Sequence, residues 1–284
     1  MIDDIGIDRI EKTFDYSEHL MGGGSISADM PENNDRGRVK TTVTAFRIIE
    51  LLMEEDGMGL SELARELDLA KSTVHRHLST LRDLEYVTRE DDVYRTGLRF
   101  LEIGERTRTR SDAYQLAEEK VADLAAETEE RSQFIVEEYG QGVYIFRETG
   151  ERAVRTDSEI GKRIPIHATA AGKAILASLS DDRIDEIIDQ RGLPALTEHT
   201  TTDEDALWTE LEEIRDRGYS INDQENTSGL RAIGVPVQYE TGEPLGALSV
   251  SGPTHRFRGT LFDETLPNLL LGTANELELN IQYS

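Results

Sequence analysis

Three helical patterns followed by a pair of β-prone segments, all within residues 43–95, limit the fold of this chain more than any other feature. Apolar residues from Val43 to Met53 recur at spacings that lie on one face of a helix. Ser61 can cap a second helix, and a third helix turns Val74 and its apolar successors inward. Three helices and a hairpin in so few residues predict a winged helix-turn-helix.

The third helix is a basic stretch without acids in a strongly acidic chain. The chain has 57 acidic and 31 basic residues, a net charge of −26, yet residues 70–82 hold Lys71, Arg76 and Arg82 and no acid. Lys and Arg neutralise DNA phosphates, and short polar side chains reach base edges in the major groove. The alternative is an ordinary amphipathic helix with a solvated polar side. The preceding helix and the following hairpin favour DNA, with these candidate contact residues: Ser61, Lys71, Ser72, Thr73, His75, Arg76 and Ser79.

The segment that follows the hairpin is rich in arginine. Residues 95–110 hold five Arg and two Glu, which fits either a second phosphate contact or a charged linker helix. The hairpin tip at 90–92 is acidic, so we do not expect it to enter the minor groove deeply.

The pattern along the chain predicts four segments. Residues 1–37 are weakly patterned and Gly-rich, so we expect a flexible N-terminal extension, with the translation start at Met1 or Met30 left open. The others are a winged helix-turn-helix over 38–97, a linker helix over 98–112 and a second domain over 113–284. In that domain strands interleave with helices, which is typical of an α+β or α/β fold.

Several classes of protein are excluded or disfavoured. The chain has no Cys, which excludes disulfides and thiolate chemistry, and its histidines lack the spacing of a metal site. Its N-terminus is acidic where a signal peptide is basic, and no apolar run is long enough to span a membrane, so we expect a cytoplasmic protein. The sequence around Gly172 lacks the residues of a phosphate-binding loop, and no serine lies in a nucleophile elbow. We therefore expect no catalytic site, no cofactor and no metal.

The basic residues are almost all arginine, with 25 Arg and 6 Lys. Together with the acid excess, this composition is typical of a cytosolic protein adapted to molar salt, where a hydrated acidic surface resists aggregation. At about 1 M salt the screening length is roughly 3 Å, so repulsion between an acidic protein and DNA largely disappears.

Three ordered segments carry a family resemblance: LAKSTVHRHL at 69–78, GKRIPIHATAAGKAIL at 161–176, and GLRAIGVPV at 229–237, which is followed by GALSVSGP at 246–253. With them the chain, over roughly residues 38–284, resembles the IclR family of transcriptional regulators. The resemblance implies an α+β architecture, with an N-terminal winged helix, a linker helix and a C-terminal effector-binding domain related to GAF and PAS sensors.

The resemblance also implies an effector pocket that takes small organic acids. It assigns the anion to the backbone amides of Ala170 and Ala171, which agrees with the preference of helix N-termini for carboxylates. It adds the paired serines Ser249 and Ser251, which share one face of a strand. Two further positions differ in character: Asn222 stands where the family often has an acid, and Ala232 is apolar.

From these features we expect a sequence-specific DNA-binding regulator, a repressor of a catabolic operon, switched by a small carboxylate effector. It should be a homo-oligomer, dimer or tetramer, because symmetric half-sites require a symmetric protein. Two alternatives stay open. One is a metabolite-binding or enzymatic GAF-like protein whose winged helix binds protein, and the other is a constitutive architectural DNA binder.

Overall fold

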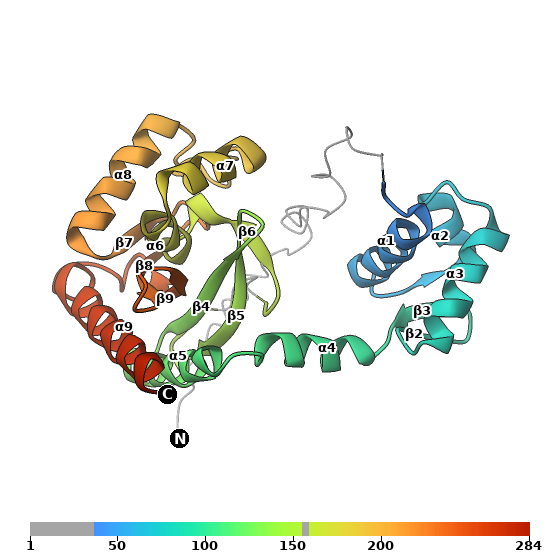
Figure 1. Cartoon of the computed structure of the whole chain (residues 1–284), viewed down its shortest axis with the longest axis horizontal. Coiled ribbons are helices and arrows are strands. Elements are labelled where there is room, and N and C mark those ends of the chain that lie inside the picture. The colour runs from blue at the N-terminus through green and yellow to red at the C-terminus, as the bar shows by residue number, and fades with distance from the viewer. Residues whose placement is uncertain (1–36, 155–158) are drawn as a thin grey trace, which may run out of the picture. The chain divides into compact units, whose positions relative to one another are not determined.

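The structure is a computed structural model that describes residues 37–154 and 159–284 (Figure 1). The chain divides into two compact units, one ending at Gly104 and the other running from Glu105 to Ser284. The expected N-terminal extension lies outside the described residues, except for Gly37. No helix in the described part of the chain has the length and hydropathy to cross a membrane.

The first unit is the predicted winged helix-turn-helix. Its three-stranded antiparallel sheet has the order β1-β3-β2. The elements of this unit, with the helix that runs beyond its end, are α1 (Lys40–Glu54), β1 (Met58–Gly59), α2 (Leu60–Glu66), α3 (Lys71–Asp83), β2 (Val87–Glu90), β3 (Val93–Thr96) and α4 (Arg99–Arg108).

The core of this unit forms where the apolar faces of its helices meet the small sheet. Leu63, Val74 and Leu78 are completely buried, and Tyr94 of β3 packs with them. The expected cap at Ser61 is wrong, because α2 begins at Leu60, two residues before the position at which a cap at Ser61 would start it. Its N-cap is Gly59, whose N–H donates to the Glu62 carboxylate at 2.8 Å.

Helix α1 buries only some of the apolar residues that the sequence pattern placed on one face. Ile48, Ile49 and Leu52 lie in the core, whereas Phe46 and Met53 are 57% and 65% exposed. The apolar residues of α1 therefore extend around the helix, beyond the face that the unit itself can cover.

The second unit is an α+β domain built on one sheet. All six strands are antiparallel, in the order β6-β5-β4-β9-β8-β7. Its elements are α5 (Asp112–Thr128), β4 (Arg131–Glu138), β5 (Gln141–Thr149), β6 (Arg163–Pro165), the 3₁₀ turn η3 (Ile166–Ala168), α6 (Ala170–Ser178), α7 (Asp181–Arg191), α8 (Glu204–Arg217), β7 (Ser220–Asp223), β8 (Leu230–Gln238), β9 (Pro244–Pro253), the π turn η4 (Leu261–Thr265) and α9 (Leu266–Tyr283).

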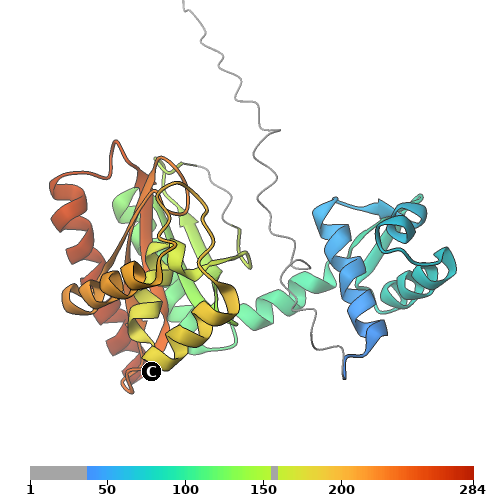
Figure 2. The same cartoon turned by 90° about the horizontal axis from the view of Figure 1, so that it is seen from above.

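Helices cover both faces of this sheet (Figure 2). Helices α5 and α9 pack on one face, where Phe134, Leu248 and Leu270 are completely buried. Helices α6, α7 and α8 enclose a second core on the other side, with Ile184 and Leu207 at its centre. The sheet is therefore covered by helices on both sides.

Two glycines allow α6 to lie against the sheet. A Cβ on Gly172 would lie 1.9 Å from the carbonyl oxygen of Ile166, and one on Gly234 of β8 would lie 2.5 Å from the carbonyl carbon of Ala170. Only hydrogen fits at both contacts, so these glycines fix how closely the N-terminus of α6 approaches the strands.

We expect Gly172→Ala to destabilise the second unit by at least about 2 kcal/mol, because the new methyl group must displace backbone. The control is Gly272→Ala in α9, where a Cβ meets no atom within 4 Å and alanine should stabilise by about 0.5–1 kcal/mol. Urea unfolding followed by the fluorescence of Trp208, the chain's one tryptophan, reports on this unit. Equal effects of the two substitutions would contradict the close-approach argument.

Candidate functional site

The exposed face of α3 carries the candidate DNA contacts. Val74, Leu78 and Leu81 turn inward, and Thr73 is half-buried beside them. The remaining predicted contacts are exposed: Ser61 on α2, and Lys71, Ser72, His75, Arg76 and Ser79 on α3. The sequence prediction and the structure therefore agree on which side of α3 is open to a ligand.

The charge on α3 is not neutralised within the described part of the chain, where neither Lys71, Arg76 nor Arg82 forms an ion pair. The hairpin differs. Arg89 pairs with Asp92 at 2.6 Å, and Arg95 of β3 pairs with Glu90 at 3.3 Å. The hairpin thus uses its arginines internally, while α3 keeps its positive charge for a polyanion.

The arginines after the hairpin also have partners within the protein. Arg99 donates to the carbonyl of Leu84 at 2.9 Å and stacks on Tyr86. Arg108 bonds both Glu105 and Glu118 and lies over the Phe146 ring. Of the two interpretations of this segment, these contacts favour the charged linker helix over a second phosphate contact.

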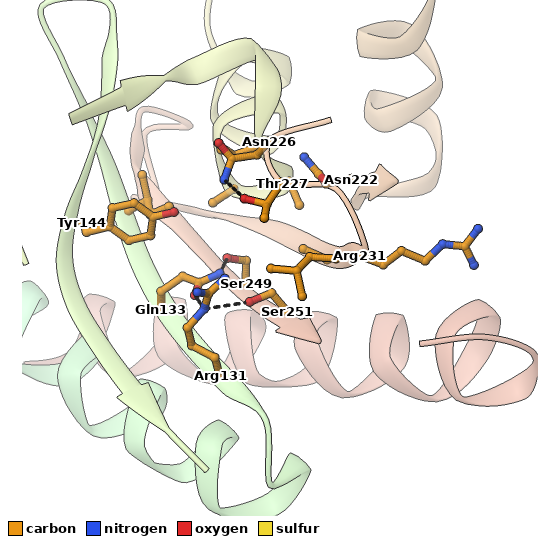
Figure 3. Close-up of a pocket in the computed structure, with 15 residues that line it drawn as sticks. Arg131, Gln133, Tyr144, Asn222, Asn226, Thr227, Arg231, Ser249 and Ser251 are labelled. Carbon is orange, nitrogen blue, oxygen red and sulfur yellow. Dashed lines mark hydrogen bonds between the residues drawn. The ribbon is translucent and has the colours of Figure 1, made fainter. Parts of the chain in front are cut away.

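A cavity that is open to solvent lies in the second unit, between the sheet and the N-terminus of α6 (Figure 3). Its base is a row of residues that face one another across four neighbouring strands. In this row Asn222 of β7 pairs with Ala232 of β8, Ala232 with Ser251 of β9, and Ser251 with Arg131 of β4. A parallel row pairs Gly234, Ser249 and Gln133.

The side chains of this base form a buried hydrogen-bond chain, visible in Figure 3. Arg131 Nε lies 3.0 Å from Ser251 Oγ and 3.1 Å from Gln133 Oε1. Gln133 Nε2 donates to Ser249 Oγ at 2.7 Å. Burial lowers the pKa of Arg131, and the neighbouring Arg147 lowers it further, but an arginine remains charged at neutral pH. The base is therefore polar and positive.

The second wall is the start of α6. Thr169 caps the helix and accepts from the N–H of Gly172 at 3.0 Å. The N–H groups of Ala170 and Ala171 belong to the first turn, which leaves them without intrahelical partners. Both residues line the cavity, so the positive end of the helix dipole faces it.

Asn222 is buried at the edge of the cavity, where its side-chain Nδ2 donates to the carbonyl of Ala168 at 2.5 Å. The adjacent acid, Asp223, pairs instead with Arg231, which points away from the cavity in Figure 3. The Arg231 hydrogen bonds hold the pKa of Asp223 below its usual range. No Asp or Glu is therefore among the described residues that line the cavity.

A buried lysine fixes the loop that forms the roof. Lys173 is completely buried, and its Nζ lies 2.7 and 2.8 Å from the two oxygens of Glu225 and 2.5 Å from Glu210. The Glu225 carbonyl accepts from Thr200 Oγ1 at 2.6 Å. Asn226, the next residue, lines the cavity. Lys173 therefore holds the roof of the cavity. Its burial makes it inaccessible to a nucleotide, which agrees with the lack of a phosphate-binding loop around Gly172.

All the candidate effector residues line this one cavity: Ala170, Ala171, Asn222, Ala232, Ser249 and Ser251. Sequence reasoning missed other lining residues, chiefly Arg131, Gln133, Tyr144, Asn226 and Thr227. The signal that could have found two of them is the period-two spacing of Arg131, Gln133 and Ile135, which places all three on one face of β4. Among the described residues no group of His, Asp or Glu side chains is placed to hold a metal ion.

Each of the two units matches a known protein domain family. The IclR helix-turn-helix domain matches residues 42–91, and the domain described as bacterial transcriptional regulator IclR C-terminal matches residues 106–278. The probable HTH-type transcriptional regulator ArcR of Halobacterium salinarum is 32% identical over 261 residues, which cover 90% of this chain and 99% of that protein.

Two further relatives extend the comparison. The transcriptional repressor IclR of Escherichia coli is 28% identical over 225 residues, covering 78% of this chain and 82% of that protein. A crystal structure of an IclR homologue from Microbacterium hydrocarbonoxydans, complexed with 4-hydroxybenzoate, has a TM-score of 0.74 at 23% identity. That match covers 86% of this chain and 100% of the other, and it is a likeness of fold.

Lys173→Met should destabilise the second unit by about 3–5 kcal/mol at neutral pH, because it leaves Glu225 and Glu210 facing each other without a cation. Burial already raises the pKa of Glu225 above its value in the unfolded chain. As the pH falls toward the unfolded-state pKa, the folded variant takes up a proton on this carboxyl, so its loss of stability relative to the unsubstituted protein should shrink. Urea unfolding at several pH values measures both effects.

The matched control for this prediction is Lys120→Met. Lys120 pairs at 2.8 Å with Glu276, which is largely exposed, so this pair should contribute less than about 1 kcal/mol. A deficit of similar size in both variants, or one that grows on acidification, would contradict the role given to the buried pair.

Proposed function

The chain belongs to the IclR family of transcriptional regulators, and from that membership we propose that it is a repressor of a catabolic operon switched by a small organic acid. Helix α3 reads the operator, and a carboxylate effector occupies the cavity beside α6. One observation carries the proposal. In a chain of net charge −26, the described residues include a basic helix face without internal ion pairs and a cavity without a lining carboxylate.

The proposed contact with DNA uses the exposed side of α3 together with Ser61 of α2. Arg76 and Lys71 provide positive charge, and the small hydroxyl side chains can approach base edges. The proposed contacts are Ser61, Lys71, Ser72, Thr73, His75, Arg76 and Ser79. The paired arginines of the hairpin support a role for it in positioning, without deep entry into the minor groove.

The effector carboxylate binds at the N-terminus of α6, where the amides of Ala170 and Ala171 and the helix dipole favour an anion. Ser249, Ser251 and Asn222 supply further polar contacts, and Ala232 lies between them. The effector switches the protein only if it binds two arrangements of the oligomer with different affinity.

A homo-oligomer, dimer or tetramer, is part of the proposal. Exposed apolar side chains on α1 and around α4 support it: Phe46, Met53, Leu98 and Leu101 are 57%, 65%, 84% and 69% exposed. Apolar groups so exposed are typical of an interface between protein chains. A symmetric dimer would present two copies of α3 to a palindromic operator. Because its proposed target is the cell's own DNA, we place the protein in the cytoplasm and assign it no enzymatic reaction.

Arg76→Ala should abolish operator binding, because it removes the central cation of the α3 face, while ligand binding in the second unit stays unchanged. Genome-wide crosslinking of the tagged protein first recovers its DNA sites, and anisotropy with the recovered fragments then gives the affinity. Arg258→Ala, which removes an equal charge from the exposed surface of the second unit, is the control. Unchanged operator binding by the Arg76 variant would refute the role of α3.

Operator affinity should tolerate high KCl. At about 1 M salt the screening length is roughly 3 Å, so repulsion between the acidic protein and DNA is suppressed and short contacts decide binding. Titration of the same fragments from low to molar KCl measures the salt slope. A loss of about 10³-fold or more over a fourfold increase, the behaviour of ordinary DNA-binding proteins, would show that the acidic surface gives no such tolerance.

A further inference from the structure

We propose that the cavity selects an oxygen-rich aliphatic carboxylate, a short acid with hydroxyl or keto oxygens along its carbon chain, and that Gln133 is the residue that sets this preference. The proposal rests on the proposed function, since it takes the cavity for the effector site. Its evidence is independent of that function, because it comes from the direction of each hydrogen bond at the base of the cavity.

Arg131 fixes the orientation of the Gln133 amide. A guanidinium can only donate, so the atom of Gln133 that lies 3.1 Å from Arg131 Nε must be the carbonyl oxygen. The amide nitrogen then faces Ser249 and donates to its hydroxyl at 2.7 Å. Ser249 is thereby an acceptor within the protein, and its own hydrogen is left to point toward a ligand.

Ser251 is polarised in the same way. Its hydroxyl oxygen accepts from Arg131 Nε at 3.0 Å, so its hydrogen is also directed elsewhere. Gln133, Ser249 and Ser251 are all at least nine-tenths buried. The base of the cavity therefore presents hydroxyl donors on a positively charged support, and oxygen acceptors of a ligand satisfy it best.

The other wall has the same polarity. The first-turn amides of Ala170 and Ala171 are donors, and they need a second set of acceptor oxygens. Asn222 adds one acceptor, because its Nδ2 is committed to the carbonyl of Ala168 and its Oδ1 is left to receive a ligand hydroxyl. A ligand with a carboxylate and additional oxygens along its chain matches both walls, whereas a single terminal carboxylate matches one.

An aromatic acid fits this lining poorly. Tyr144 is the one aromatic side chain among the 15 residues drawn in Figure 3, and most of the others are polar. A flat ring over the base would remove water from Ser249, Ser251 and Gln133 without replacing its hydrogen bonds. Buried groups left unpaired in this way make a site built for hydroxyls reject a ligand that lacks them.

Titration calorimetry on the full chain tests the preference with three probes: D-gluconate, 4-hydroxybenzoate and D-glucose. Gluconate carries both the carboxylate and the hydroxyls, and each of the others lacks part of this set. We expect gluconate to bind at least about 100-fold more tightly than either of the other two. Equal or tighter binding of 4-hydroxybenzoate, or no binding of gluconate at about 10 mM, would overturn the proposal.

Gln133→Leu tests the specificity role. It should weaken gluconate binding by about 10–100-fold and reduce the discrimination against 4-hydroxybenzoate, because the orientation of Ser249 is lost. The control is Ser132→Ala on the same strand. Ser132 alternates to the opposite face, and its buried hydroxyl has no hydrogen-bond partner among the described residues, so gluconate binding should stay unchanged.

If Gln133→Leu fails to fold, as judged by Trp208 fluorescence, Ser249→Ala removes the terminal donor of the same chain and should give the same loss. Unchanged discrimination in the folded variant would overturn the assignment to Gln133. Operator binding is measured separately on the recovered DNA fragments. A protein that binds DNA but not gluconate refutes the ligand class alone, and one that binds gluconate but no DNA refutes the proposed function alone.

Discussion

The second unit depends on one buried cation, Lys173. Its ammonium group joins helix α6, on which it lies, to Glu210 of α8 and to Glu225 in the loop that closes the cavity. A lysine without exposure to water is tolerated only when its charge is compensated at hydrogen-bond distance, and both carboxylates meet this condition. Because the same short helix presents its first-turn amides to the cavity, the ion cluster and the proposed anion site are parts of one rigid support.

Much of the fold could be predicted from local patterns. The helical spacings gave the winged helix-turn-helix, since Val74, Leu78 and Leu81 repeat at the period of a helix and are buried as expected. The α+β class of the second unit is also confirmed. The cavity residues were reached by another route, the resemblance of three segments to a family. Ala170, Asn222 and Ser249 are far apart in sequence, and only the strand pairing and the packing of α6 on the sheet bring them together.

The remaining features depend on contacts that no local pattern encodes. Arg131 and Gln133 alternate with buried neighbours, but a charged and an amide side chain do not indicate a buried strand until the partner serines of β9 are known. The N-cap of α2 moved to Gly59 because Glu62 could reach its N–H, which outweighed the preference for Ser61. Phe46 and Met53 fit the helical spacing of α1 yet are exposed, since periodicity gives the apolar residues of a helix without showing which of them a neighbour covers.

The distribution of acidic residues links the two proposed binding sites. With 57 Asp and Glu in the chain, a surface chosen at random would carry many carboxylates, which repel anions and accept the hydrogen bonds of nearby donors. Residues 70–82 have none, and none of the described residues lining the cavity is acidic. Where Asp223 comes close to the cavity, Arg231 holds it aside. An acidic protein can bind anions only where its own carboxylates are absent or neutralised, and both conditions hold at these two places.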